Sequence, residues 1–471
     1  MFLRKNTHPF ICGIAASLVF SSTICFAEPE ATRSQQLSIL EIYELAEQHD
    51  ASLAAAKAGL DAKLEINART RALFLPQVML TAETKINDSE TTNEGSSSSD
   101  AFASIGTGPH HYNSYSYTLS VKQTLLDMSS VHKIPESKIK EGQANVAFML
   151  AEQALVAKVG TAYIETLMAE EDLLVAYAEE KAIEEQLLKA KLGFELGTAT
   201  IANTHEAQAA RDLVHAGVIA NENKLEVAKL AIMTLTGQNN TNLQRIKGEL
   251  SLNNPAFKVP EFDKLLSIAI QANSGLILAK LDQALAKSKL DQAKAGRVPT
   301  LNALAAYGKN NANGSAFSPT RSETHYYSAG IELKVPLYTG GALSSGIRSA
   351  SAKFEEKKQL HLNKKRDLEL ELREAALFVT LATSQVQAFS QAVKSSTVSL
   401  ESTTVGFDLG ERTVLDVLAV QKNYYKAVRD LSNAQYQYLL AVLGLKFSMG
   451  ILSNADLDKM ADMIANISGK N

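Results

Sequence analysis

Four short segments of the chain alternate apolar and polar residues, which predicts four β-strands. In the first of them, Val78 and Leu80 share one face, while Thr81 and Glu83 share the other. A proline precedes the first and the third segment, and in both places it ends a helical pattern. The predicted strands cover residues of about 76–88, 112–124, 299–309 and 325–337.

Long stretches rich in Ala, Leu, Lys and Glu make up most of the remaining chain and predict helices. At 1.5 Å per residue, the stretch 135–192 would be roughly 85 Å long. In the last stretch, 413–447, the residues on one side of the predicted helix are separated alternately by three and four positions. This is the 3.5-residue period of a coiled coil. The predicted helices cover residues 37–73, 135–192, 200–235, 262–295, 349–407 and 413–447.

The chain reads as an internal duplication of two halves, 28–258 and 259–471. The segment GFELGTATIANTH at 193–205 recurs 213 residues later as GFDLGERTVLDVL. Upstream, LAEQHDASL at 45–53 matches IAIQANSGL after a shift of 223 residues. Because the glycine segment separates two predicted helices in each half, it predicts the tip of a helical hairpin, at about 193–199 and 406–412.

The N-terminus has the pattern of a cleaved signal peptide over residues 1–27. Arg4 and Lys5 precede a short apolar run, and small residues follow up to Ala27. A transmembrane anchor is disfavoured because the run is shorter than the ~20 residues that a span needs. Lipidation of Cys25 remains a second alternative, disfavoured by the bulky Ile24 before it.

Composition and motifs argue against an enzyme and against nucleic-acid binding. The chain has 47 basic and 51 acidic residues, with a net charge of −4, and therefore no basic footprint. Its two cysteines, Cys12 and Cys25, both lie in the predicted signal peptide. His110 and His111 are expected in a polar loop without further ligands at metal spacing. No nucleophile with a base and no phosphate-binding loop is found, so no cofactor is expected.

Four strands are too few to close a barrel, and one sheet with an apolar face would leave two unpaired edges. A bilayer does not tolerate such edges, because no water satisfies their backbone groups. If the apolar face meets lipid, several copies of the chain must share one barrel. A water-soluble sandwich of two hairpins is the alternative. The tyrosines at the strand starts favour the membrane: Tyr115, Tyr117, Tyr326 and Tyr327.

Three phrases in this order, within a duplication, carry a resemblance to a known family: QTLLDM at 123–128, VPLYTGG at 335–341 and GERTVLDVL at 410–418. The chain resembles the TolC family of outer-membrane exit ducts from residue 37 to about 457. The resemblance implies a mainly α protein with a small β part. It implies a homotrimer whose long antiparallel coiled-coil helices form an α-barrel in the periplasm. Its twelve strands, four per copy, would form one β-barrel in the outer membrane of a Gram-negative bacterium.

The same resemblance implies a passive conduit for efflux or type I secretion. A periplasmic adaptor and an inner-membrane pump of the RND, ABC or MFS type would open its tip. Two other classes of protein are alternatives. A periplasmic adaptor would have one helical hairpin and a lipoyl-like domain, and an adhesin stalk would need no pore. The substrate, drug or protein, is not indicated.

The resemblance also implies roles at the tip. Asp416 would face the pore and favour cations, although Thr413 and Asp416 also fit a helix cap. Ala419 stands where other members have a second aspartate. Arg412 would latch the closed tip, with a weaker latch because Phe407 and Asn203 replace a tyrosine and an acid.

Two further sets of residues complete the expected site. Four glycines would shape the tip turns and touch the adaptor, since such turns need conformations that glycine adopts most easily: Gly193, Gly197, Gly406 and Gly410. Four charged strand residues would line the barrel lumen: Glu83, Lys122, Glu332 and Lys334. The alternative is that they lie on an ordinary solvated face of the sheet.

Overall fold

The computed structural model describes residues 37–91, 108–238, 243, 260–315 and 320–466. The predicted signal peptide, with Cys12 and Cys25, lies outside these residues. None of the helices in the described ranges is long and apolar enough to cross a membrane.

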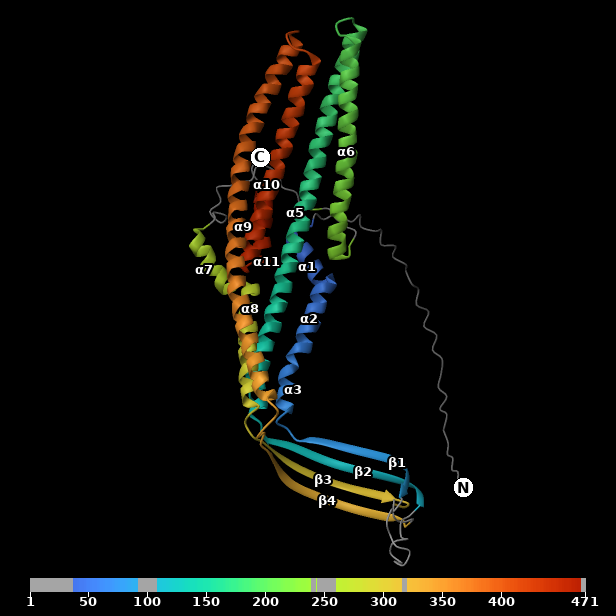
Figure 1. Cartoon of the computed structure of the whole chain (residues 1–471). Coiled ribbons are helices and arrows are strands. Elements are labelled where there is room, and N and C mark those ends of the chain that lie inside the picture. Colours follow the sequence, from blue (N-terminus) through green and yellow to red (C-terminus); the bar gives the residue numbers. More distant parts are fainter. Residues whose placement is uncertain (1–36, 92–107, 239–242, 244–259, 316–319, 467–471) are drawn as a thin grey trace, which may run out of the picture. The chain divides into compact units, whose positions relative to one another are not determined.

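Two helical hairpins dominate the described chain. Helix α5 (Lys133–Glu195) runs beside α6 (Ile201–Thr236), and α9 (Ala342–Asp408) runs beside α10 (Val414–Met449) (Figure 1). Pro135 lies in the first turn of α5, where no intrahelical partner is needed for a backbone N–H. Both α6 and α10 end at a glycine with positive φ, Gly237 and Gly450.

The four strands form one antiparallel sheet in the order β1-β2-β3-β4. They are β1 (Gln77–Thr91), β2 (Gly108–Leu126), β3 (Thr300–Ala312) and β4 (Ser322–Lys334). Because β2 pairs with β3, the two hairpins are joined edge to edge, and the sandwich alternative is wrong. His110 and His111 lie inside β2, so their predicted loop position is also wrong.

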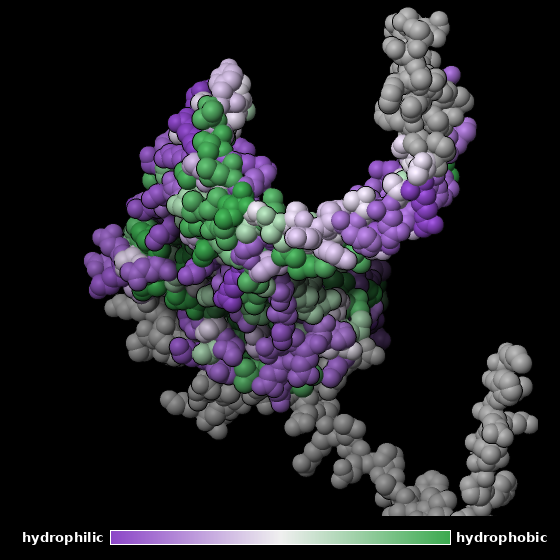
Figure 2. All heavy atoms as spheres, turned by 90° about the horizontal axis from the view of Figure 1, so that it is seen from below, coloured by the Kyte–Doolittle hydropathy of each residue, from purple (hydrophilic) through white to green (hydrophobic). Residues whose placement is uncertain are grey.

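The pairing register places the four predicted apolar rows on one face of the sheet. Val78 is opposite Val121 on β2, and Tyr307 on β3 is opposite both Leu119 and Tyr327. This face is exposed in the single chain: Val78 is 65% and Tyr327 is 89% exposed. Figure 2, the space-filling view from below, shows hydrophobic as well as hydrophilic residues at the surface. Such an exposed apolar face indicates a surface that contacts a membrane or another protein and not water.

Tyr326 differs from the other three strand-start tyrosines, because it lies on the opposite face. Its hydroxyl is 2.8 Å from Thr118 Oγ1. Its ring lies over Gly308, where an added Cβ would come within 2.5 Å of ring atoms. Only glycine at position 308 leaves room for this ring.

The two predicted helices before the strands are interrupted, so the expectation of continuous helices there is wrong. The first consists of α1 (Ile39–His49), α2 (Ala51–Leu64) and α3 (Ile66–Ala72), and the second of α7 (Phe262–Ala272) and α8 (Ser274–Ala295). Asp50 and Asn273, at equivalent positions of the two halves, cause the first break in each. Both have extended backbones, and their side chains accept the N–H of the residue three positions later at 2.9 Å.

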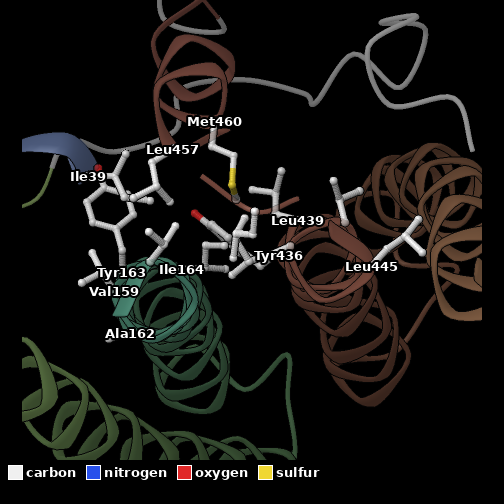
Figure 3. Packing of buried hydrophobic residues seen from close by; sticks show 14 of the residues in the cluster. Ile39, Val159, Ala162, Tyr163, Ile164, Tyr436, Leu439, Leu445, Leu457 and Met460 are labelled. Atoms are coloured by element: carbon white, nitrogen blue, oxygen red, sulfur yellow. The ribbon is translucent and has the colours of Figure 1, made fainter. Parts of the chain in front are cut away.

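The main core lies where α1, α5, α10 and α11 (Asn454–Asn466) meet. Figure 3 shows Ile39, Tyr163, Tyr436 and Leu457 pointing toward one another from these four helices. Helix α11 belongs to the segment after Gly450. It packs on α1 and α5. A short helix, α4 (Met128–Val131), follows β2.

Asp50 makes this region sensitive to acid. Burial acts to raise the pKa of Asp50, but hydrogen bonds from Ser52 and the Leu53 N–H, together with Lys158, lower it to about 2. Because the folded-state pKa lies below the ordinary 3.8, the carboxylate stabilises the fold above about pH 4. That contribution, about 2 kcal/mol, is lost as the pH falls toward 2.

We therefore expect Asp50→Asn to lose this part of the acid sensitivity. Urea unfolding between pH 6 and pH 2.5 measures it, with Asp50→Ala as the control that also removes the cap. Asparagine keeps the cap, as Asn273 does in the second half. An unchanged pH dependence in Asp50→Asn would contradict the assignment.

Candidate functional site

The turns at the two hairpin tips have the same hydrogen bonds in both halves. In the first, the N–H of Gly197 donates to Phe194 O at 3.0 Å, and that of Thr198 donates to Gly193 O at 2.8 Å. In the second, Gly410 donates to Phe407 O at 3.0 Å, and Glu411 to Gly406 O at 2.8 Å. The sequence match thus corresponds to matching local geometry.

The four tip glycines are required for two different reasons. Gly197 and Gly410 have φ of 74° and 80°, a region that other residues enter at a cost. At Gly193 and Gly406, the absence of a side chain instead allows a residue on the other side of the turn to lie close to the backbone. A Cβ at Gly406 would lie 2.9 Å from Arg412 Cγ, and one at Gly193 would lie 3.1 Å from Ala199 Cβ.

Asp416 caps α10. The Asp416 N–H donates to Thr413 Oγ1 at 3.2 Å, and the Thr413 N–H and hydroxyl donate to Asp416 Oδ2, both at 2.9 Å. These bonds, from the backbone first and the hydroxyl second, hold the pKa of Asp416 below 3.8, and Arg412 adds to the effect. The carboxylate is partly exposed at the tip, so capping leaves it available as a charge.

The other expected latch residues are differently engaged. Phe407 packs against an apolar cluster that joins the two hairpin tips: Ile183, Leu187, Ala190, Ala207, Val414 and Leu418. The Arg412 side chain is exposed, and within the described residues it forms no ion pair. Asn203 bonds with Thr200, whose hydroxyl is 3.2 Å from Asn203 Oδ1. Among the described residues of one chain, no hydrogen bond or ion pair joins Arg412 to Asn203.

The four expected lumen residues share the face of the sheet opposite the apolar one. This follows from the register, since Lys122 is opposite Gln77 and Glu332 is opposite Asn302. Glu83 pairs with Lys85 at 2.8 Å, and Glu332 pairs with Lys334 at 3.1 Å. One face of the sheet is thus charged and the other apolar.

Comparison with known proteins decides the family. The model of the outer membrane efflux protein family matches residues 42–238 and 265–451. The chain belongs to the outer membrane efflux protein family. This efflux protein is an outer-membrane exit duct of efflux or type I secretion systems. It is neither a periplasmic adaptor nor an adhesin stalk.

Three relatives illustrate the similarity. The efflux protein is 31% identical to the outer membrane protein TolC of Vibrio cholerae serotype O1 over 421 residues, 89% of this chain and 92% of the relative. It is 26% identical to the proteases secretion protein PrtF of Dickeya chrysanthemi, over 91% of each chain. The solved structure of the outer membrane protein VceC from Vibrio cholerae has a TM-score of 0.69 at 19% identity, covering 88% of this chain and 96% of that one.

Two features of the efflux protein were missed by the sequence reasoning. The first is that Asn203 is the counterpart of Asp416, because both stand three residues after a capping threonine. Subtracting the tip offset of 213 residues from position 416 identifies Asn203 as this counterpart. The second is an ion pair between the buried Glu179 and the partly exposed Arg429, which no local pattern in either helix indicates.

In the described residues, no group of three His, Asp or Glu side chains is arranged to hold a metal ion.

Proposed function

We propose that three copies of this efflux protein assemble into one passive duct, with their twelve strands closing a barrel in outer-membrane lipid. The observation that carries the proposal is the four-stranded sheet, which has an exposed apolar face and two outer strands, β1 and β4. In lipid the outer backbone groups of these strands need partners, and a second and third copy would supply them. The charged face, with Glu83 and Lys122, would then line the lumen.

The helical hairpins would continue this duct through the periplasm. At their tips, a periplasmic adaptor would contact the glycine turns, and an inner-membrane pump of the RND, ABC or MFS type would drive opening. Asp416 would form a ring of three carboxylates at the narrow end, and Arg412 would reach a neighbouring copy. The protein acts as a conduit and carries out no catalysis. Residues 1–27 would be removed on export, and the two halves of the mature chain would derive from a duplication.

Single-channel recording of the mature protein in a planar bilayer tests this proposal. Small cation-selective currents from a species with the mass of a trimer are the expected result. A folded oligomer that gives no current would overturn the duct, and a folded species of another stoichiometry would overturn the shared barrel.

Arg412→Ala is expected to raise the resting conductance by roughly twofold or more, because it removes a charged side chain that helps to close the tip. The rise stays modest, since Phe407 and Asn203 offer Arg412 neither a hydroxyl nor a carboxylate. Single-channel recording measures the change. Glu411→Ala, in the same turn, is the matched control and should leave the conductance near that of the wild type. An unchanged conductance in Arg412→Ala would rule out the latch.

A further inference from the structure

Each outer edge of the sheet carries a histidine paired with a carboxylate, and Figure 1 shows β1 and β4 at these two edges. At the β1 edge, His111 Nδ1 lies 3.0 Å from Asp88 Oδ1. At the β4 edge, His325 Nε2 lies 3.1 Å from Glu323 Oε1. Imidazole nitrogens and carboxylate oxygens are common ligands of divalent transition metals. Each edge therefore carries part of the ligand set that a metal ion needs.

Both pairs lie on the apolar face of the sheet. Residues two positions apart on a strand share a face, and Asp88 follows Ile86 by two positions. His325 precedes Tyr327 by two positions in the same way. His111 is opposite Asp88 in the pairing register. The four side chains thus continue the apolar face beyond its tyrosines, where a barrel in lipid would reach water.

Within one chain the two pairs cannot meet. The register sets His325 opposite Lys309 on β3, which in turn is opposite Tyr117 on β2. Tyr117 is opposite Ala82 on β1, so His325 is level with a residue six positions before Asp88. Two strands also separate them. Accordingly, the described residues of a single chain contain no group of three side chains arranged for a metal.

Closure of a barrel by three copies would bring the two edges together with a defined offset. Strands in a barrel tilt, so the register shifts on going once around it. For twelve strands, a tilt of about 35–45° corresponds to a total shift of roughly 12–18 residues, or about four to six per copy. The shift per copy must be even, because an odd shift would turn the apolar face of one copy inward.

Both even values bring the two pairs together. A shift of about six places His325 opposite Asp88 of the next copy, and one of about four places Glu323 opposite that Asp88. In either register all residues of β4 find a partner on β1. A shift in the opposite direction would place His325 level with Pro76 or Val78 and leave most of β4 unpaired. Directly opposite and diagonal side chains lie within about 4.5–8 Å, which is close enough for one ion to bridge them.

We propose that each seam, β4 of one copy with β1 of the next, binds one divalent transition-metal ion of the Zn²⁺ type. The ligands are His325 and Glu323 of one copy with His111 and Asp88 of the next. Two imidazoles and two carboxylates form a donor set that Zn²⁺ accepts. This inference rests on the proposed barrel of three copies. The metal ties neighbouring copies together at the end of the barrel that lies beyond the tyrosines.

The contacts within each pair leave suitable atoms for the metal. Asp88 Oδ1 holds His111 Nδ1, and among the described contacts His111 Nε2 has no partner. A carboxylate on the other ring nitrogen is the usual way in which a metal-binding histidine is oriented. At the other edge, Glu323 Oε1 contacts both His325 and Lys309. His325 Nδ1 and Glu323 Oε2 therefore remain for the ion.

Zinc titration of the purified mature protein, first stripped with a chelator, tests the site. The expected result is one Zn²⁺ per copy. His325→Ala and His111→Ala should each lower the affinity at least about tenfold. His215→Ala is the matched control and should bind zinc as the wild type does. His215 also pairs with a carboxylate, that of Glu180 at 2.6 Å, but within one helical hairpin.

Cysteine cross-linking tests the seam without a metal. Asp88→Cys combined with either His325→Cys or Glu323→Cys should give disulfide-linked copies, since one of the two β4 positions lies opposite Asp88. Asp88→Cys with Leu333→Cys is the control. Leu333 lies on the same face of β4, eight positions from His325, and should give no cross-link.

The outcomes separate the metal site from the proposed barrel. Zinc binding that is absent in the wild type, or equal in the wild type and His325→Ala, would overturn the site, while cross-linked copies would keep the barrel. A folded protein that is not a trimer and forms no cross-link would overturn both. If a histidine variant fails to assemble, the wild type still decides. Zinc should raise the temperature at which detergent separates its copies, and no rise would overturn the site.

Discussion

Asp416→Asn is expected to remove most of the cation selectivity of the duct, bringing the cation-to-anion permeability ratio down to roughly one. In the proposed trimer the substitution removes three carboxylates from the narrowest part of the conduit. Ala419 lies one turn further along the same helix and offers no second ring. Reversal potentials in a salt gradient measure the ratio.

The substitution should not unfold the tip, because asparagine already occupies the equivalent position in the first half. Asn203 follows its capping threonine by three residues, as Asp416 does. The control is Thr413→Ala, which weakens the cap by about 1 kcal/mol and keeps the charge. If both variants retained selectivity, or both lost it, the carboxylate would not be the selectivity-determining group.

The pH dependence of the cation selectivity is a second test of the role assigned to Asp416. The pKa of Asp416 lies below 3.8, because the Thr413 N–H and hydroxyl stabilise the carboxylate. Its charge therefore persists at a pH where an ordinary aspartate is already half protonated. Selectivity should therefore decline at a lower pH than the pKa of an ordinary aspartate would give. In Thr413→Ala, without the hydroxyl, the decline should begin at higher pH.

Gly450→Ala is expected to cause the largest loss of stability, about 3 kcal/mol or more. Gly450 has a φ of 75°, which already disfavours alanine. In addition, a Cβ there would lie 2.6 Å from Ala272 O and from Asn273 Cα, both of which are backbone atoms. Neither can move away as a flexible side chain would. Urea unfolding of the purified protein measures the loss.

The matched control is Gly410→Ala at the tip. Gly410 has a similar φ of 80°, but no atom lies within 4 Å of the position that a Cβ would take. This variant should lose only about 1–2 kcal/mol of stability, because alanine adopts a positive φ less favourably than glycine does. Equal losses in the two variants would show that the close contact at Gly450 does not matter.

The contact at Gly450 also explains the break between α7 and α8. Asn273 Nδ2 donates to Ser448 O at 2.8 Å, so the residue that interrupts one helix also binds the end of another. Gln153 Nε2 of α5 donates to Gly450 O at 2.8 Å. Three distant parts of the chain therefore meet at one glycine.

Local patterns in the sequence by themselves determined much of this protein. Alternation of period two was enough to place Val78 and Leu80 on one strand face, because side chains of a strand alternate strictly. The duplicated glycine segment was enough to predict both hairpin tips. Asp50 and Asn273 carried a local cap signal as well, but it was read as part of a continuous helix.

The tertiary structure decided what depends on pairing between distant segments. Strands β2 and β3 belong to different halves, and no local pattern says whether their hairpins stack or join edge to edge. Likewise, Glu179 and Arg429 look like ordinary exposed charges in their own helices. Only the packing of α5 on α10 buries Glu179 beside a partly exposed Arg429, and the free energy of burying a charge depends on the partner that it meets.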